Sequence, residues 1–317
     1  MATEARRPRR RWRRRILIAL AATVLTAPLA PVVLVEALAR LQSPGAVAPP
    51  PSSVQIVDRN GVRLATLASR AGGFRETLPL THMGPHLPAA IVAVEDARFF
   101  EHGGVDWTSA FGAAWSDLAS LRIKRGASTL SMQLYRLREP RARSFLGKLE
   151  QAVRGKQLDA QLGKQGVLEA YLNEAPFGGN LVGAASASRF YFGVEPERLS
   201  LAQAALLAGI PQAPNRLRPD RFPQKALARR DVVLQRMLDT HTITREQFET
   251  ATHEPLTVVR ASLPQEDPAH AAALPALTES AARTKRCCHD GRRCDATHRV
   301  RPVTRATRHA SPRAIAA

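Results

Sequence analysis

The sequence lacks cysteine over almost its whole length. Its three cysteines, Cys287, Cys288 and Cys294, all lie near the C-terminus. The core of the long body therefore cannot depend on disulfide bonds. These cysteines and the nearby His289 and His298 match no common zinc-binding spacing. We therefore expect no metal site in this segment.

The middle of the chain also has little net charge, although the chain as a whole carries +19. Residues 1–15 contribute about +7 and residues 257–317 about +6, which leaves about +6 for the long stretch between them. A nucleic-acid-binding domain carries its basic residues on the folded body. We therefore expect no nucleic-acid partner. The sequence contains no internal repeat of the length that solenoids and propellers show.

The basic N-terminus is followed by apolar residues. Ile16 to Val35 is an uncharged stretch of about the length that spans a bilayer core. Basic residues on its leading side hold that side in the cytoplasm. We predict a basic cytoplasmic segment at 1–15, a transmembrane anchor at 16–39 and a Pro-rich spacer at 40–53. A cleaved signal peptide, processed near Ala27 to Ala30, is the alternative. Both interpretations place the following residues across the membrane.

From residue 54 the pattern indicates a folded domain that ends near residue 255. Alternating residues around Asp58–Gly61 predict one short β-hairpin. Helical periodicity then starts near Pro88 and continues, with capping boxes at Ser200 and Thr244. Further helices are expected over 107–121, 128–137, 145–162 and 164–173. Residues 256–317 lose this pattern, and their composition is typical of a disordered or disrupted tail.

Two carboxylates stand side by side after the apolar run Ile91 to Val94. They are Glu95 and Asp96, and Arg98, His102 and Asp106 follow at helix-like spacing. An apolar wall disfavours the charged form of a carboxylate and so suits it for proton transfer. A Glu-Asp pair alone is more often a solvated helix face. The interpretation therefore depends on a second element, Arg125-Gly126-Ala127-Ser128-Thr129-Leu130-Ser131-Met132-Gln133-Leu134.

Together the two elements resemble the family 51 peptidoglycan glycosyltransferases of class A penicillin-binding proteins. That family carries Glu-Asp-x-x-Phe-x-x-His-x-Gly-Val-Asp, which appears here at Glu95–Asp106, and then Gly-Gly-Ser-Thr-Ile-Thr-Gln-Gln-Leu. The Met132-Gln133 pair in the second motif is most like the 1C branch of the family. Later segments resemble the family as well, namely Lys164–Asn173, Ala184–Gly193 and Leu206–Pro219.

The resemblance implies a mainly α, lysozyme-like bilobal glycosyltransferase domain with a short β element, behind the N-terminal transmembrane helix. It also implies a glycan-chain polymerase on the outer face of a bacterial inner membrane, with lipid II and nascent glycan as substrates. Cell-wall synthesis proteins are further candidate partners. We expect no organic cofactor, and a divalent cation such as Mg²⁺ or Mn²⁺ as an accessory.

The same resemblance assigns roles to individual residues. Glu95 is the expected general base, which takes the proton of the acceptor hydroxyl. Expected substrate contacts are Asp96, Arg98, Ser128, Thr129, Gln133 and Lys148, and accessory candidates are His102, Glu150, Gln151, Arg125 and Arg136. His102 has a purely structural interpretation as well, and Ser128 and Thr129 can equally be ordinary helix caps. Phe99 and Phe100 are expected in the core.

The chain departs from the family pattern in two places. The family has a second glutamate three residues beyond Lys148, where this chain has Gln151, with Glu150 beside it. Glu150 lies about 100° further around a helix, so it does not simply replace the missing carboxylate. The Ser-x-x-Lys and Lys-Thr-Gly motifs of a transpeptidase domain are absent. We therefore expect a truncated, frame-disrupted or monofunctional chain.

Two other functions fit parts of the sequence. A lytic muramidase of related fold needs one acidic glutamate, but it has no diphosphate to hold and so does not account for the Ser-Thr-x-x-x-Gln element. A non-catalytic membrane scaffold would use the Arg-rich ends, and the missing second glutamate favours it.

Overall fold

The computed structural model describes residues 29–44, 48–57, 59, 63–69, 73–120, 128–140 and 144–259, together with Trp12, Arg15 and Ile18. Several predicted features lie outside these residues. They are Arg125, most of the anchor before residue 29, part of the hairpin turn, the tail from residue 260 and its cysteine cluster. The described part is mainly helical with small sheets, as the periodicity indicated.

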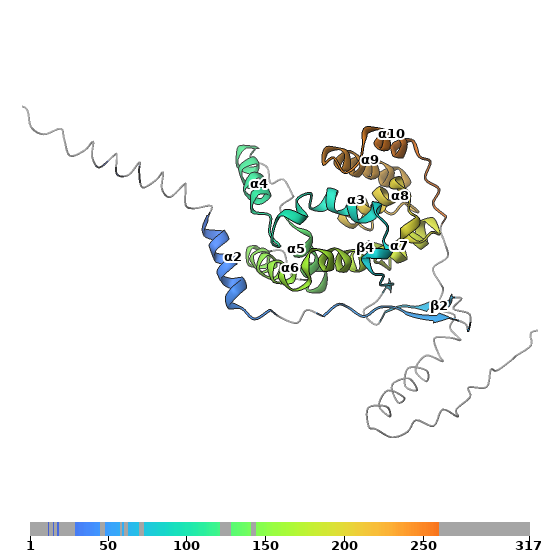
Figure 1. The fold of residues 1–317 in the computed structure, drawn as a ribbon, viewed down its shortest axis with the longest axis horizontal. Coiled ribbons are helices and arrows are strands. Elements are labelled where there is room, and N and C mark those ends of the chain that lie inside the picture. The colour runs from blue at the N-terminus through green and yellow to red at the C-terminus, as the bar shows by residue number, and fades with distance from the viewer. Residues whose placement is uncertain are drawn as a thin grey trace, which may run out of the picture. The chain divides into compact units, whose positions relative to one another are not determined.

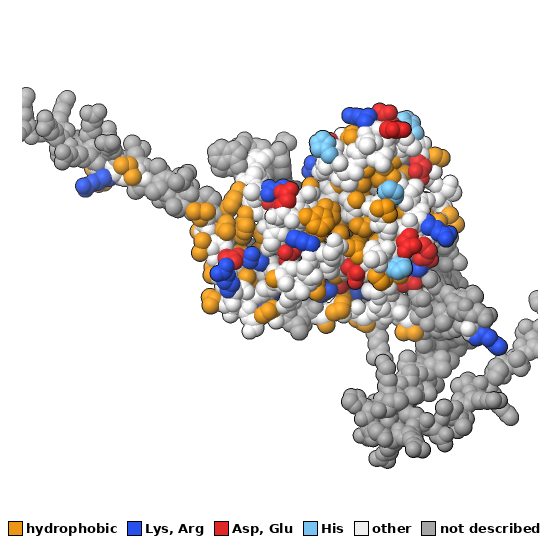
Figure 2. Space-filling view, viewed as in Figure 1, with side chains coloured by type: hydrophobic (Ala, Val, Ile, Leu, Met, Phe, Trp, Pro, Cys, Tyr) orange, Lys and Arg blue, Asp and Glu red, His pale blue; other side chains and the backbone are white. Residues whose placement is uncertain are grey.

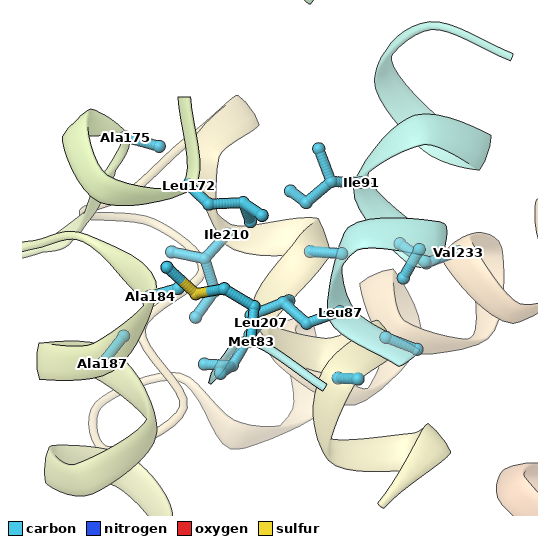
Figure 3. Close-up of a cluster of buried hydrophobic side chains, with 14 of the residues drawn as sticks. Met83, Leu87, Ile91, Leu172, Ala175, Ala184, Ala187, Leu207, Ile210 and Val233 are labelled. Atoms are coloured by element: carbon cyan, nitrogen blue, oxygen red, sulfur yellow. The ribbon is translucent and has the colours of Figure 1, made fainter. Parts of the chain in front are cut away.

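Four helices form one side of the core. They are α3 (His86–Glu95), α8 (Leu201–Gly209), α9 (Pro223–Asp239) and α10 (Arg245–His253), and Figure 1 shows α8, α9 and α10 gathered beside α3. Leu87 and Ile91 of α3 meet Leu207 of α8 and Val233 of α9 in the buried cluster of Figure 3. Because α3 is packed on several sides, it reads as a nearly continuous apolar run.

The helix starts follow local chemistry. Ser200 and Gln203 form the predicted capping box of α8, and Thr244 and Gln247 form that of α10. The start of α3 differs slightly from the prediction, because the helix begins at His86 and Pro88 is its third residue. Proline is tolerated there because backbone N–H groups in the first turn have no partner within the helix.

A pair of packed helices forms the other side. The helix α5 (Leu130–Arg138) lies against α6 (Phe145–Glu174), and α4 (Trp107–Ser120) precedes them. The backbone of α6 is not helical at Gly163, where φ is 66° and ψ is 172°, so α6 is two helical segments that meet at a kink. This agrees with the two helices expected over 145–162 and 164–173. The shorter α7 (Ala184–Phe192) follows, and short 3₁₀ turns lie at η1 (Leu80–His82), η2 (Phe99–Glu101), η3 (Pro196–Arg198) and η4 (Ile210–Gln212).

The predicted β-hairpin is confirmed. Strand β1 (Val54–Val57) pairs antiparallel with β2 (Arg63–Leu67). A second sheet was not predicted, in which β5 (Leu181–Val182) pairs parallel with β3 (Phe74–Arg75) and antiparallel with β4 (Pro176–Gly178). Strands of two or three residues are too short for an alternating pattern to reveal them.

The helix α2 (Leu29–Leu41) packs on α6. Its last carbonyl groups, which have no partner within the helix, accept from the side chain of Gln157, which donates to Ala39 at 3.0 Å and to Gln42 at 2.8 Å. Within the described residues, no helix combines the length and the apolar character needed to cross a membrane.

The surface of the described body mixes charges of both signs. On the face in Figure 2, acidic and basic side chains lie next to one another, with apolar side chains between them. This mixing agrees with the small net charge that the sequence places between its basic ends.

Close packing of α5 on α6 leads to a stability prediction. A Cβ at Gly155 would lie 2.9 Å from Met132 Cγ and 3.0 Å from Met132 N, whereas a Cβ at Gly112 on α4 meets nothing within 4 Å. We expect Gly155→Ala to lower the free energy of unfolding by about 1–3 kcal/mol through overpacking. The matched Gly112→Ala substitution should raise it by about 0.5–1 kcal/mol through helix propensity. Chemical denaturation of both variants tests this, and equal effects of the same sign would contradict it.

Candidate active site

The helix α3 delivers Glu95 to the site. Glu95 is its last residue, and it is half-buried one turn beyond the fully buried Ile91. The helix ends because Asp96 leaves the helical backbone region, with φ of −160° and ψ of 72°. The helix-like spacing of Glu95, Arg98, His102 and Asp106 is therefore not the spacing of one helix, and that interpretation was wrong. The chain turns at Asp96 and passes through η2 before α4 begins.

Asp96 fixes this turn from inside. Its carboxylate is buried and accepts hydrogen bonds from Leu130 N at 3.0 Å and from His102 Nε2 at 2.9 and 3.1 Å. Leu130 N is at the start of α5, so Asp96 joins the end of α3 to the start of α5. A buried carboxylate needs such partners, because leaving it unpaired costs several kcal/mol.

His102 is held in place by its hydrogen bonds to the Asp96 carboxylate. Its side chain is 6% exposed, and its Nδ1 has no hydrogen-bond partner in the described part of the chain. Since a carboxylate only accepts, Nε2 carries the proton that the pair shares. This geometry agrees with the structural interpretation of His102.

Arg98 and Asp106 hold the loop between η2 and α4. Arg98 Nε donates to Glu101 at 2.9 Å. The NH1 group of Arg98 donates to the Thr108 hydroxyl and lies 3.7 Å from the Asp106 carboxylate. Asp106 precedes α4 and accepts from the Ser109 hydroxyl, from Ser109 N at 3.0 Å and from the Thr108 hydroxyl at 2.6 Å. Burial alone would raise the pKa of Asp106, but these bonds and Arg98 outweigh it and lower the pKa to about 2. An aspartate directly before the helix expected at 107–121 is a favoured N-cap, although Asp106 was not singled out as one.

The two aromatic residues of the motif differ. Phe99 is fully buried, as predicted, whereas Phe100 is 60% exposed, so its placement in the core was wrong. Adjacent residues on a 3₁₀ turn point in different directions, so one of the pair faces water.

The start of α5 places the second motif. Thr129 is the N-cap, since its hydroxyl accepts from Met132 N at 3.3 Å and donates to Gly104 O at 2.6 Å. Ser128 lies outside the helix, which begins two residues later than predicted, and its hydroxyl accepts from Lys148 Nζ. Of the two hydroxyls, Thr129 therefore acts as the ordinary cap and Ser128 faces a cation.

Gln133 connects α5 to the candidate base. Its Nε2 donates to Glu95 Oε2 at 2.9 Å, and its Oε1 accepts from the hydroxyl of Tyr171 at 3.3 Å. Gln133 Nε2 also lies 3.5 Å from Ser128 O. Burial first, and the Glu95 carboxylate second, raise the pKa of Tyr171 well above its ordinary value, so Tyr171 stays a neutral donor. A relay of fixed donors therefore orients one oxygen of Glu95.

Tyr171 itself was not predicted as a site residue. It lies in the Lys164–Asn173 segment, which resembles the family but was assigned no role. Tyr171 lies eight residues beyond the kink at Gly163, where its hydroxyl reaches Gln133 of α5. No local pattern in the sequence indicates this contact.

Lys148 and Arg136 form a small basic group beside Ser128. Desolvation lowers the pKa of the Lys148 ammonium, and the neighbouring Arg136 guanidinium lowers it further. Neither side chain forms an ion pair with a carboxylate in the described residues. Two unpaired cations beside a hydroxyl are suited to an anionic group. Arg125, which was expected here too, lies outside the described residues.

Glu150 and Gln151 occupy the region where the family has its second glutamate. Glu150 Oε1 accepts from the hydroxyl of Tyr135 at 2.9 Å, and Gln151 is half-buried on α6. No group of three His, Cys, Asp or Glu side chains suited to a metal occurs in the part of the chain that the structure describes. The divalent cation therefore stays an expectation from the family resemblance, with no ligand group for it among the described residues.

The low pKa of Asp106 predicts a pH-dependent stability. An Asp whose folded pKa is about 2, against an ordinary 3.8, stabilises the fold above about pH 4 and loses this contribution as the pH falls to about 2. We expect Asp106→Asn to be less stable than the parent by about 2 kcal/mol at neutral pH, with the difference vanishing near pH 2. Denaturation curves of both chains across this range test it. A difference that stays constant down to pH 2 would rule out the charge as its cause.

Comparison with known proteins agrees with the motifs. Residues 60–238 match the family model described as Transglycosylase. Penicillin-binding protein 1C of Escherichia coli K12 is 41% identical over 210 residues, which are 66% of this chain and 27% of that protein. A Cupriavidus necator protein, provisionally named a transglycosylase, is 35% identical over 58% of this chain and 80% of its own length.

A solved structure of penicillin-binding protein 1A from Haemophilus influenzae matches with a TM-score of 0.39 and 22% identity, over 68% of this chain and 22% of that one. So low a score does not decide the fold. The chain spans about a quarter of the length of the penicillin-binding proteins that it matches. The family model, by contrast, covers more than half of the chain. The chain belongs to the transglycosylase family of peptidoglycan glycosyltransferases.

Proposed function

We propose that this chain polymerises glycan, transferring a lipid-diphosphate-linked glycan onto a sugar hydroxyl of lipid II. The observation that carries the proposal is Gln133, whose side chain donates to the Glu95 carboxylate and also lies 3.5 Å from Ser128 O, while the Ser128 hydroxyl accepts from Lys148, the neighbour of Arg136. A proton acceptor and an anion-binding group are the two parts that this reaction needs.

The chemistry uses the residues as follows. The acceptor hydroxyl attacks the anomeric carbon of the donor, and its proton passes to Glu95. The bond between the anomeric carbon and the diphosphate oxygen breaks, and the lipid diphosphate leaves with the bonding electrons. Lys148, Arg136 and the Ser128 hydroxyl offset the charge that develops on it. Because the attack is direct, it inverts the anomeric carbon.

Asp96, His102, Arg98 and Thr129 have supporting tasks in this proposal. Except for His102 Nδ1, which is buried without a partner, the polar atoms named above are bonded within the protein, so these residues position the loop and the start of α5 rather than bind sugar. Among the described residues, Gln133 is the one whose side chain is hydrogen-bonded to Glu95. Gln151 is then a neutral neighbour of Lys148, and Arg125 is a further candidate for binding the diphosphate.

The surroundings in this proposal follow from the family. The catalytic domain is two-lobed and lysozyme-like, on the periplasmic side of a bacterial inner membrane, with a single anchor at 16–39. Its substrates are lipid II and nascent glycan, and cell-wall synthesis proteins are its partners. Lytic cleavage of glycan is the alternative function, because it uses the same glutamate. It leaves the cation pair of Lys148 and Arg136 without a task.

Replacement of the base tests the function. We expect the parent chain to convert lipid II into long glycan on a gel, and Glu95→Gln to produce none, because an amide does not accept the proton. Glu246→Gln, on the exposed face of α10, is the matched control and should keep full activity. Cleavage of finished sacculi by the parent would instead support the lytic function. A parent that does neither would contradict both enzymatic functions.

Lys148 should act on the diphosphate rather than on the hydroxyl proton. We expect Lys148→Gln to lower kcat/KM with lipid II at least tenfold, because one charge-assisted contact is lost. The KM should rise for the donor glycan, whose diphosphate departs. Lys225→Gln, an exposed residue of α9, is the control. Unchanged kinetics in Lys148→Gln would place the diphosphate elsewhere.

A further inference from the structure

The kink of α6 is crossed by an ion pair that the proposed chemistry does not use. Lys164, directly after Gly163, donates through Nζ to Asp159 Oδ1 at 2.7 Å. The backbone at Gly163, with φ of 66° and ψ of 172°, lies in a region that only glycine adopts readily. A Cβ there would meet nothing within 4 Å, so conformation rather than crowding requires glycine. The two segments of α6 are therefore joined by side chains directly across the break.

Both members of the pair also contact elements that carry the two sequence motifs. Asp159 Oδ1 accepts from the hydroxyl of Ser131, a fully buried residue of α5, at 3.0 Å. Lys164 Nζ lies 4.6 Å from the centroid of the Phe99 ring, and Phe99 is fully buried in η2. An aromatic face attracts a cation placed over it. The pair therefore connects the kink with η2, which belongs to the first motif, and with α5, which carries the second.

Burial distinguishes this pair from an ordinary surface ion pair. The side chains of Lys164 and Asp159 are 22% and 11% exposed, whereas those of Arg40 and Glu36 on α2 are 78% and 37% exposed. Exposed pairs contribute little because water and salt screen them. A largely buried charge that loses its partner is left uncompensated, so such a pair holds its elements more firmly.

The second segment of α6 carries Tyr171 and is held near both of its ends. At the far end, Glu174 accepts from Arg138 of α5 through Nε at 2.9 Å and through NH2 at 2.7 Å. At the near end, Lys164 makes the ion pair across the kink. Tyr171 lies between these two points and donates to Gln133 at 3.3 Å. A shift at the start of the segment therefore changes where the Tyr171 hydroxyl lies relative to Gln133.

The first segment of α6 is held to α5 separately. Glu150 on this segment accepts from the hydroxyl of Tyr135 at 2.9 Å. Lys148, also on this segment, therefore keeps its place beside Ser128 when the ion pair across the kink is broken. Loss of that pair should accordingly affect the groups that orient the base and leave the cation group in place.

We infer that Lys164 is a positioning residue, which together with Asp159 sets the angle between the two segments of α6. That angle places the Tyr171 hydroxyl where it orients the amide of Gln133. The Gln133 amide in turn orients Glu95. The inference rests on the proposed function of Glu95 as the base. Lys164 thus acts on the reaction through three side chains and does not itself contact the substrate.

Fluorine NMR of the tyrosines in the full chain tests this directly. The chain contains three tyrosines, Tyr135, Tyr171 and Tyr191, so labelling with 3-fluorotyrosine gives a simple spectrum in which Tyr171→Phe identifies the signal of interest. We expect Lys164→Met and Asp159→Asn to move the Tyr171 signal in the same direction, because both break one contact. The Tyr191 signal should stay in place. Shifts in opposite directions would overturn the inference, because they would report only the loss of opposite charges.

Three further variants sharpen this test. Lys164→Arg keeps the cation and should leave the Tyr171 signal close to its parent position. The double variant Lys164→Met with Asp159→Asn should move the signal no further than the single variants, because all of them break the same contact. Lys225→Met is the matched control, since Lys225 also lies over a phenylalanine ring, 5.1 Å from the centroid of Phe222, but is exposed on α9. It should leave the Tyr171 signal unchanged.

Kinetics should follow the spectra. In Lys164→Met, kcat with lipid II should fall about tenfold because the base is misplaced, whereas KM should change little because the cation group stays in place. Asp159→Asn replaces it if the methionine variant does not fold. A Tyr171 signal at its parent position in both variants overturns the inference, as does an equal disturbance of all three tyrosine signals, which would indicate general destabilisation. If the parent makes no glycan, the proposed function fails, and the fluorine spectra still decide the role of Lys164.

Discussion

The buried carboxylate of Asp96 is the constraint on which the site depends. It accepts from the first N–H of α5 and from His102, and so it ties the end of α3 to the start of α5. The two candidate catalytic elements come from these two ends, Glu95 on one side and Ser128 to Gln133 on the other. A carboxylate with these partners permits only one arrangement of the turn, because any other would leave a charge buried without bonds.

Two further hydrogen-bond donors, from Gln133 and Tyr171, fix the position of Glu95 relative to this turn. The Tyr171 hydroxyl donates to Gln133 and so orients its amide, and this amide in turn donates to Glu95 and orients the carboxylate. Tyr171 belongs to the second segment of α6, whose first segment supplies Lys148. The kink at Gly163 therefore allows one long element to serve both the base and the cation group. Preorganised polar groups of this kind need little rearrangement during reaction, which is how electrostatic stabilisation becomes effective.

The candidate site has one accessible carboxylate where the family pattern has two. Gln151 offers no charge, and Glu150 is occupied by Tyr135. Besides the buried Asp96–His102 pair, the charged groups of the candidate site are then the Glu95 carboxylate and the cations Lys148 and Arg136. Such a balance suits a reaction whose leaving group is strongly anionic and whose nucleophile is neutral.

Patterns in the sequence predict the helical class, the hairpin that begins at residue 54, and the capping boxes at Ser200 and Thr244. The sequence also contains the motifs that identify the family. These features depend on neighbours within a few residues, so their signal is local. Only tertiary packing produces the break in the helix at Asp96, the exposure of Phe100, the short β3–β5–β4 sheet, and the hydrogen bonds that join Glu95 to Gln133 and Gln133 to Tyr171. Those contacts join residues tens of positions apart, and burial and packing across elements, rather than local propensity, bring them together.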